Sequence, residues 1–311
     1  MTDSFAGCLL GGAVGDALGA PFEGLWSHSI PAPGDLLSGY AEFEGYPPGQ
    51  FTDDTQLTLA LVESIVEEGE LVLSDVIRRV AELWRTRRVI GPGGACTMAA
   101  ENFLRRGRWE DCGAPVGQAG NGAAMRLAPL GLWFLEDPDG LPGAAAAVSR
   151  LTHQDPRSVA GGVAVAVAAR ELAATGDLRC EVVAEAMAPF DEPFAGAVRS
   201  LSAGTSDDEV AWAGQSRPEF DRPIVTPFVV PTVLACLRSV LRHPDSWPDA
   251  VAATIGLGGD VDTTGAIAGA LLGAKLGESS IPRHLAAGVV DSEHIRSLAR
   301  HYRILAERRR R

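Results

Sequence analysis

Apolar residues recur at intervals of three and four along most of the chain, which is the spacing that one face of an α-helix turns toward a core. The pattern predicts helices over residues 5–19, 54–68, 74–87, 95–106, 141–150, 156–175, 180–189, 206–213, 226–242, 246–255, 262–276 and 292–306. A further helix is expected after Gly122, with Met125, Leu127, Leu130 and Trp133 on its apolar face and a kink at Pro129. No stretch shows the convincing two-residue alternation of a β-strand. We therefore expect an all-α fold.

Two of the predicted helices carry glycine at every fourth position. The first has Gly7, Gly11, Gly15 and Gly19, and the helix from residue 262 has Gly265, Gly269 and Gly273. Glycine inside a helix costs roughly 1 kcal/mol relative to alanine. A stripe of glycines therefore indicates that another backbone packs closely against it. These two helices are candidates to pack against each other at the centre of the fold.

Segments without a helical period separate these helices. Residues 25–50 are rich in Gly, Pro and Ser and are predicted to be a surface loop, and residues 111–121 form a second, glycine-rich loop. Neither resembles an interdomain linker, and there is no sequence repeat of 20–50 residues. We expect residues 1–311 to form one domain, with a basic, frayed tail at 307–311.

The composition is that of an ordinary soluble globular protein, with 46% hydrophobic and 22% charged residues. The net charge of −13 is a poor match for a nucleic-acid backbone. The apolar runs 163–169 and 265–274 are too short to cross a membrane, and no basic segment at the N-terminus indicates a signal peptide. We expect no membrane or nucleic-acid partner, and a monomer or weak homo-oligomer.

The cysteines indicate neither a disulfide framework nor a zinc site. They are odd in number, scattered and without a CxxC motif: Cys8, Cys96, Cys112, Cys180 and Cys236. This usage fits a reducing compartment, so a cytoplasmic location is expected.

Two clusters of oxygen-bearing side chains each precede an apolar helix. Residues 51–56 read Phe-Thr-Asp-Asp-Thr-Gln, and residues 258–264 read Gly-Gly-Asp-Val-Asp-Thr-Thr. Asp53 and Gln56 have the spacing of a capping box, which is the ordinary interpretation of the first cluster alone. Two such clusters, with no His or Cys in either, instead suit Mg²⁺, Mn²⁺ or Ca²⁺.

These motifs, taken together, resemble the ADP-ribosylglycohydrolase family. The matching segments are Gly11–Gly19 with Glu23, Pro48–Thr55, Gly120–Arg126, Leu151–His153, and Gly258–Thr263 followed by Ile281 and Pro282. The resemblance covers nearly the whole chain. It implies a single-domain orthogonal helical bundle and an enzyme that cleaves the glycosidic bond between ADP-ribose and an acceptor, either a protein side chain or a small molecule.

The resemblance also implies a centre of two divalent cations, Mg²⁺ or Mn²⁺. The ligands that it implies are Thr52, Asp53, Asp54, Asp260, Asp262 and Thr263. Glu23, Asp54 and Asp260 would be the catalytic residues, with Glu23 acting on the leaving group or on water, and Asp16 would orient ligands. Two cations about 3.5–4 Å apart can hold neighbouring oxygens such as the vicinal hydroxyls of a ribose.

A second set of residues is expected to bind the substrate. It comprises Gly117, Gln118, Ala119, Gly120, Asn121, Gly122 and His153. The loop can hold a pyrophosphate on free N–H groups at a helix N-terminus, or it can be a plain tight turn. His153 resembles the nucleotide-side histidine of the family, although an isolated histidine is more often structural. Trp26 and Trp133 are candidates for stacking on adenine, and core packing is the stronger expectation for Trp133.

Two alternatives to an ADP-ribose hydrolase stay open. One is a catalytically silent, ADP-ribose-binding or crystallin-like relative, and the other is a two-metal phosphoester or pyrophosphate hydrolase. The acceptor also stays open, because neither Gln118-Ala119 nor the tyrosine-free segment Ile224–Phe228 indicates a particular linkage.

Overall fold

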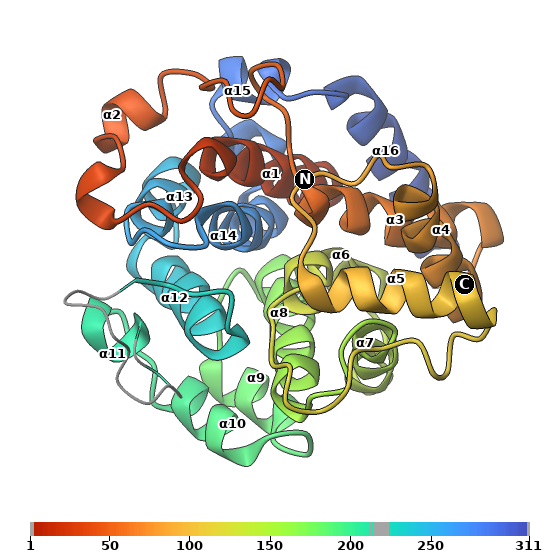
Figure 1. Cartoon of the computed structure of the whole chain (residues 1–311). Helices are drawn as coiled ribbons and strands as arrows, with labels where there is room; N and C mark the ends of the chain where they lie inside the picture. The colour runs from red at the N-terminus through yellow and green to blue at the C-terminus, as the bar shows by residue number, and fades with distance from the viewer. Residues whose placement is uncertain (1–2, 212, 214–223, 310–311) are drawn as a thin grey trace.

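The protein is an all-α bundle, as predicted. The computed structural model describes residues 3–211, 213 and 224–309 (Figure 1). The longer helices are α1 (Ser4–Gly19), α3 (Asp53–Glu68), α4 (Leu73–Arg85), α5 (Gly94–Arg106), α7 (Leu141–Arg150), α8 (Pro156–Thr175), α12 (Val229–Arg242), α13 (Trp247–Ile255), α14 (Val261–Leu276) and α16 (Ser292–Arg309). The shorter ones are α2 (Pro33–Leu36), α6 (Ala128–Trp133), α9 (Cys180–Met187), α10 (Glu192–Arg199), α11 (Asp207–Ala211) and α15 (Arg283–Gly288). Extended pairing in these residues is confined to isolated bridges.

The two glycine-striped helices α1 and α14 lie against each other at the centre of the molecule (Figure 1). A Cβ atom added to Gly7 would lie 2.1 Å from the carbonyl oxygen of Gly273, and one on Gly15 would lie 2.0 Å from that of Gly265. Only glycine permits this backbone approach, so the prediction from the stripes is confirmed. The two helices run in opposite directions, because Gly19, at the end of α1, meets Val261, at the start of α14.

One hydrophobic core surrounds this central pair and extends from Phe5 to Ala306. Two of its helical segments, Ser4–Phe22 and Pro156–Thr175, are long and apolar enough to cross a membrane. In each, however, most of the apolar window is buried inside the molecule, 83% and 78% respectively. Core packing therefore accounts for their composition.

Several predicted element boundaries are wrong for local reasons. The segment predicted as a loop at 25–50 contains a 3-10 turn (Ser27–Ser29) and α2, and α10 and α15 were not predicted. The helix predicted from 226 begins at Val229. Pro227 disfavours helical geometry at the residue before it, Thr226. Residue 212, part of the helix predicted at 206–213, lies outside the described residues.

Pro129 begins a helix and does not kink one. A 3-10 turn, Ala124–Arg126, ends before it, and α6 starts at Ala128 with the proline in its first turn. Proline fits there because the first N–H groups of a helix have no intrahelical acceptor.

The predicted frayed tail is helical as far as the structure describes it. Helix α16 continues through Arg309, whose guanidinium lies over the rings of Trp133 (5.5 Å) and Phe134 (4.5 Å). These contacts anchor the end of the helix. Residues 310 and 311 lie outside the described residues.

Candidate active site

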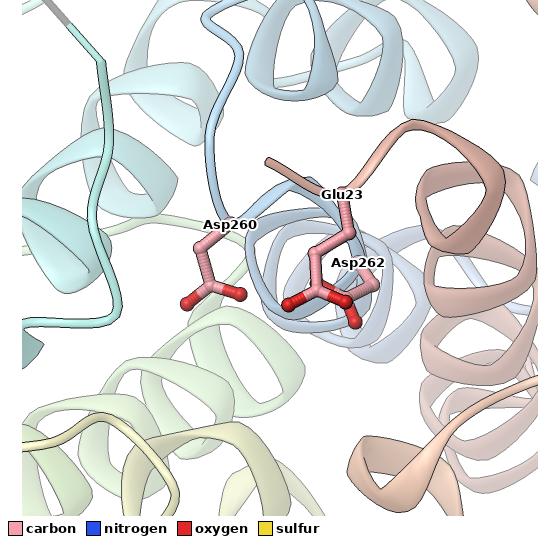
Figure 2. Close-up of side chains that lie close together, drawn as sticks. All are labelled: Glu23, Asp260 and Asp262. Carbon is pink, nitrogen blue, oxygen red and sulfur yellow. The ribbon is translucent and has the colours of Figure 1, made fainter. Parts of the chain in front are cut away.

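The starts of α3 and α14 bring the two acidic clusters to one pocket, although they are about 200 residues apart in sequence. Asp53 and Asp54 come from α3, and Asp260 and Asp262 come from α14. Glu23 reaches the same place from the segment after α1. Carboxylate oxygens of Glu23, Asp260 and Asp262 all lie within 4.8 Å of one another (Figure 2).

Backbone hydrogen bonds hold the Glu23 segment beside the start of α14. The N–H of Gly24 donates to the carbonyl oxygen of Gly259 (2.8 Å), and the N–H of Gly259 donates to that of Leu25 (2.8 Å). Gly259 has φ = +90°, and a Cβ atom there would lie 2.0 Å from the carbonyl oxygen of Val225. Glycine at this position therefore lets three chain segments meet next to Asp260.

Asp16 of α1 caps the N-terminus of α3 from a neighbouring helix. Its buried carboxylate accepts from the backbone N–H groups of Thr52 and Thr55 (3.0 Å each) and from both hydroxyls. The capping box that was set aside in favour of a metal site does not form, because the Gln56 amide instead binds the backbone of Arg88 and Ile90. Asp53 and Asp54 are thereby free to face the pocket.

The acidic cluster is buried without a cationic partner. No arginine, lysine or histidine of the described residues pairs with Asp53, Asp54, Asp260 or Asp262 within 4.0 Å. The Oδ1 atom of Asp54 is buried and has no hydrogen-bond partner among the same residues. Leaving a buried carboxylate unpaired is costly, and a bound cation would remove that cost.

The pKa values of these carboxyl groups are raised because the groups are buried close to one another. Burial, followed by the neighbouring carboxylates, raises the pKa of Asp53, Asp54 and Asp262 well above the usual range. Burial also raises the pKa of Asp260, against hydrogen bonds that lower it. For Glu23, burial and then the charge of Asp260 raise the pKa. A divalent cation would reverse this balance by favouring the ionised forms.

The two predicted threonine ligands lie on either side of Asp54. Thr52 Oγ1 is 2.9 Å from an oxygen of Asp16 and 3.2 Å from Asp54 Oδ2, and it does not line the pocket. Thr263 lines the pocket, and its hydroxyl interacts with Asp54 and Asp260. All donors in the set are carboxylate or hydroxyl oxygens, which fit Mg²⁺ or Mn²⁺.

Residues from other segments line the rest of the pocket and form its second wall, which adjoins the acidic cluster at Asn121. Gly120, Asn121, Gly122, His153 and Pro227 line it. The enclosed volume is about 150 Å³. This is smaller than the roughly 300–1,000 Å³ of a pocket that encloses a drug-sized ligand, so a nucleotide sugar would be enclosed only in part.

The comparisons with known proteins agree with this geometry. The family model described as ADP-ribosylglycohydrolase matches residues 1–311. The chain belongs to the ADP-ribosylglycohydrolase family.

Relatives and a solved structure extend over most of the chain. It is 31% identical to the ADP-ribosyl-[dinitrogen reductase] glycohydrolase of Rhodospirillum rubrum, covering 90% of this chain and 88% of that protein. It is 29% identical to the ADP-ribosylhydrolase ARH3 of Gallus gallus, covering 89% and 86%. A solved structure titled "ADP-ribosylglycohydrolase-related protein complex" matches with a TM-score of 0.74 and 30% identity over 98% of each chain. The family thus comprises hydrolases of ADP-ribose linkages.

Only part of the loop predicted to bind substrate reaches the pocket of this family member. Gly120, Asn121 and Gly122 line it, whereas Gly117, Gln118 and Ala119 do not. The Gly117 N–H donates to Asp155 Oδ2 (2.8 Å), and the Ala119 carbonyl accepts from the N–H of Val229 (3.0 Å).

The helix N-terminus that was expected to hold a pyrophosphate is absent from this part of the structure. Only the 3-10 turn Ala124–Arg126 follows Gly122, and it is too short to sum its peptide dipoles. Asn121 serves the acidic wall, because its amide donates to Asp260 Oδ2 and to Thr232 Oγ1 (3.0 Å).

The two tryptophans that were candidates for stacking on adenine lie in different surroundings. Trp133 stacks on Tyr302 in the core, with ring centroids 5.5 Å apart, so it is not available to adenine. Trp26 is half-buried in the segment after Glu23, where its backbone pairs with Gly258.

Sequence reasoning missed several residues at the pocket. The segment Gly91–Ala95 closes the side next to Asp53, whose Oδ2 accepts from the N–H of Gly93 (3.4 Å). Cys96 also lines the pocket, and Arg126 lies behind it in contact with the Gly122 carbonyl. The Pro92-Gly93-Gly94 break was a signal for the first, but it was interpreted only as a helix boundary.

Proposed function

We propose that the protein is a metal-dependent hydrolase that releases ADP-ribose by cleaving its glycosidic bond to an acceptor. Family membership supports the reaction class. The observation that carries the metal dependence is the group of buried carboxylates from α3 and α14, which no cationic side chain of the described residues neutralises.

The proposed cofactor is a pair of divalent cations, Mg²⁺ or Mn²⁺. The oxygen donors for it are those of Thr52, Asp53, Asp54, Asp260, Asp262 and Thr263, with Glu23 nearby. When bound, such cations supply Lewis-acid polarisation and fix the positions of substrate hydroxyls and water.

The protein's own groups then divide the remaining tasks. Glu23 lies on an exposed segment at the pocket, where burial and then the charge of Asp260 raise its pKa and so favour the form that can donate a proton. Its carboxyl group is the candidate to protonate the leaving acceptor or to take a proton from water. Asp16 and Asn121 fix the directions of the α3 start and of Asp260.

Charge development at the anomeric carbon gives the acidic wall a further role. Glycoside cleavage passes through an oxocarbenium-like state, which nearby carboxylates such as Asp54 and Asp260 stabilise. The part of the substrate beyond the ribose extends out of the pocket, because about 150 Å³ does not contain it. The acceptor is a protein side chain or a small molecule at the open side, next to Glu23.

Cellular context is proposed from the sequence alone. A cytoplasmic location agrees with the five free cysteines, and a net charge of −13 favours acceptors other than nucleic acid. The protein is proposed to act as a monomer or a weak homo-oligomer.

Product analysis tests this proposal. The protein would be incubated with Mg²⁺ or Mn²⁺ and with arginine-linked, serine-linked and nucleic-acid-linked ADP-ribose, and the products separated by chromatography. Free ADP-ribose supports the proposal, binding without release indicates a silent relative, and a phosphate product indicates a phosphoester hydrolase. Asp54→Asn serves as the inactive control, and Asp139→Asn, at an exposed position, serves as the matched active control.

A further inference from the structure

A buried arginine lies behind the second wall of the pocket, against the Gly122 carbonyl. Arg126 is 1% exposed, and no carboxylate of the described residues lies within 4.0 Å of its guanidinium. It donates instead to the carbonyl oxygens of Gly122 and Val148 and to Thr152 Oγ1 (2.6 Å). Burial lowers the pKa of Arg126, and the charge of Asp53 opposes this only from beyond ion-pair distance. A buried charge without a paired counter-charge is costly, so its retention calls for a physical explanation.

The contact between Arg126 and Thr152 determines which group accepts a hydrogen bond from the Thr152 hydroxyl. Arginine has only donors, so Thr152 Oγ1 accepts from Arg126 and keeps one proton to donate. The nearest acceptor is His153 Nδ1 at 2.8 Å. The Ser149 carbonyl is 3.5 Å away and already accepts from the backbone N–H groups of Thr152 (3.1 Å) and His153 (2.9 Å).

The remaining contact of the Thr152 hydroxyl is the thiol of Cys96, and sulfur is a weak acceptor. The Thr152 hydroxyl therefore donates its hydrogen bond to His153 Nδ1. A neutral imidazole that accepts at Nδ1 carries its own proton on Nε2.

The Nε2 edge of His153 is the edge near the pocket glycines. A Cβ atom on Gly120 would lie 3.2 Å from Nε2, and one on Gly122 would lie 2.9 Å from Cε1. Among the described residues no group accepts a hydrogen bond from Nε2. Because His153 lines the pocket, a donor at Nε2 without a protein partner is available to a ligand.

The surroundings also keep the ring neutral. Burial, and then the charge of Arg126, lowers the pKa of His153 to about 3. Asp155 acts in the opposite direction and does not overcome them. The neutral ring therefore has one fixed donor and one fixed acceptor.

The family resemblance already implies a substrate contact for His153; we propose that Arg126 is the positioning residue for it, acting through Thr152 to hold His153 as the Nε2–H tautomer with that donor at the pocket. The identity of that substrate rests on the proposed function, whereas the tautomer does not. The acceptor is an oxygen of the ADP-ribose unit, because a donor held neutral at the wall suits a phosphate or hydroxyl oxygen.

Nitrogen NMR of the imidazole tests the tautomer directly. Long-range ¹⁵N–¹H spectra of the full-length protein would be recorded from about pH 5.5 to 8, with His153→Gln to assign the signal. The wild type is expected to show a neutral Nε2–H ring throughout. An Nδ1–H ring, or a ring that becomes protonated in this range, overturns the proposal.

Variants at Thr152 separate positioning from packing. Thr152→Val removes the hydroxyl at nearly constant volume and is expected to release the tautomer and to weaken ADP-ribose binding about tenfold, the effect of one hydrogen bond. Thr152→Ser keeps the hydroxyl and is expected to restore both. Thr254→Val, at a second threonine that is 1% exposed, is the matched control and should change neither.

The outcomes distinguish the two proposals. An unchanged tautomer in Thr152→Val overturns the positioning role, and the wild-type spectrum still decides the tautomer if that variant does not fold. A wild-type Nε2–H ring without ADP-ribose binding supports the tautomer and overturns the proposed function. ADP-ribose binding by an Nδ1–H ring overturns only this inference.

Discussion

The two walls of the pocket carry buried charge of opposite sign, and neither wall is neutralised from within. On one side the carboxylates of α3 and α14 have no cationic partner within 4.0 Å among the described residues, and behind the other wall Arg126 has no carboxylate within that distance. The charge of Asp53 acts on Arg126 only at longer range. Ordinary folding would pair them, because a buried ion pair costs less than two unpaired ions.

The difference between the walls indicates what each is built to receive. The acidic wall presents hard oxygen donors and suits cations. The second wall presents the Nε2 edge of the neutral His153 ring, with the positive charge of Arg126 behind it. It suits an anionic or hydroxylated ligand. A complex of metal ions and a diphosphate sugar satisfies both walls at once.

The largest effect is expected from breaking the acidic wall. Asp54→Asn and Asp262→Asn should each reduce ADP-ribose release by about a thousandfold or more, since a bound cation supplies several kcal/mol of transition-state stabilisation. Helical content measured by circular dichroism should be unchanged, because the amide has the volume of the carboxylate. A purely capping role predicts tolerance, since Asn caps as well as Asp. Wild-type turnover in both variants would remove the metal-hydrolase account.

The next effect concerns Glu23, whose carboxylate lies beside those of Asp260 and Asp262. Glu23→Gln should lower turnover by about 10²–10⁴-fold, the usual contribution of a general acid or base. Metal and ADP-ribose binding, measured by calorimetry, should remain because the exposed segment keeps its backbone hydrogen bonds to Gly259. Glu70→Gln, at an exposed position after α3, is the control. Turnover equal to wild type would exclude Glu23 from proton transfer.

The acidic wall could be predicted from the sequence, whereas the hydrogen bonds behind the second wall could not. The carboxylates are visible in the sequence as clusters at two predicted helix starts. The four-residue glycine period predicts the contact between α1 and α14. Arg126 carries no such signal, because its role depends on Thr152 and His153, which are 26 and 27 residues away in the chain.

Long-range partners are the part that local patterns do not show. Asp16, from another helix, caps the start of α3, and a 3-10 turn follows Gly122 where a helix was expected. One missed element had a local signal: Asp191 accepts from the N–H of Phe194, and Pro193 lies in the first turn of α10. That cap and proline are typical of a helix start.

Metal binding should stabilise the fold by relieving the acidic wall. Saturation at about 100 times the dissociation constant adds about 2.7 kcal/mol, which thermal melts with Mg²⁺ or Mn²⁺ against chelator would detect. Without metal, the raised pKa values of Asp53, Asp54 and Asp262 mean that the folded state binds more protons than the unfolded state. Stability should then fall as pH rises from about 4, where the unfolded carboxyls ionise, through the raised folded values. Coincident melts with and without metal would contradict this.

The smallest effect is expected from disturbing the contact beneath the acidic wall. Gly15→Ala should destabilise the protein by about 1–3 kcal/mol, because the added methyl would lie 2.0 Å from the Gly265 carbonyl oxygen. Gly143→Ala in α7 has no atom within 4 Å and should be neutral or stabilising. Urea unfolding of both variants measures the difference, and equal midpoints would mean that the glycine contact does not hold the two helices.

Anomalous scattering from crystals grown with Mn²⁺ tests the central claim most directly. The account predicts two manganese peaks between the starts of α3 and α14, within coordination distance of Asp54 and of Asp260 or Asp262. Asp54→Asn crystals should lose at least one of them. The absence of any peak between these helix starts at saturating Mn²⁺ would contradict the account.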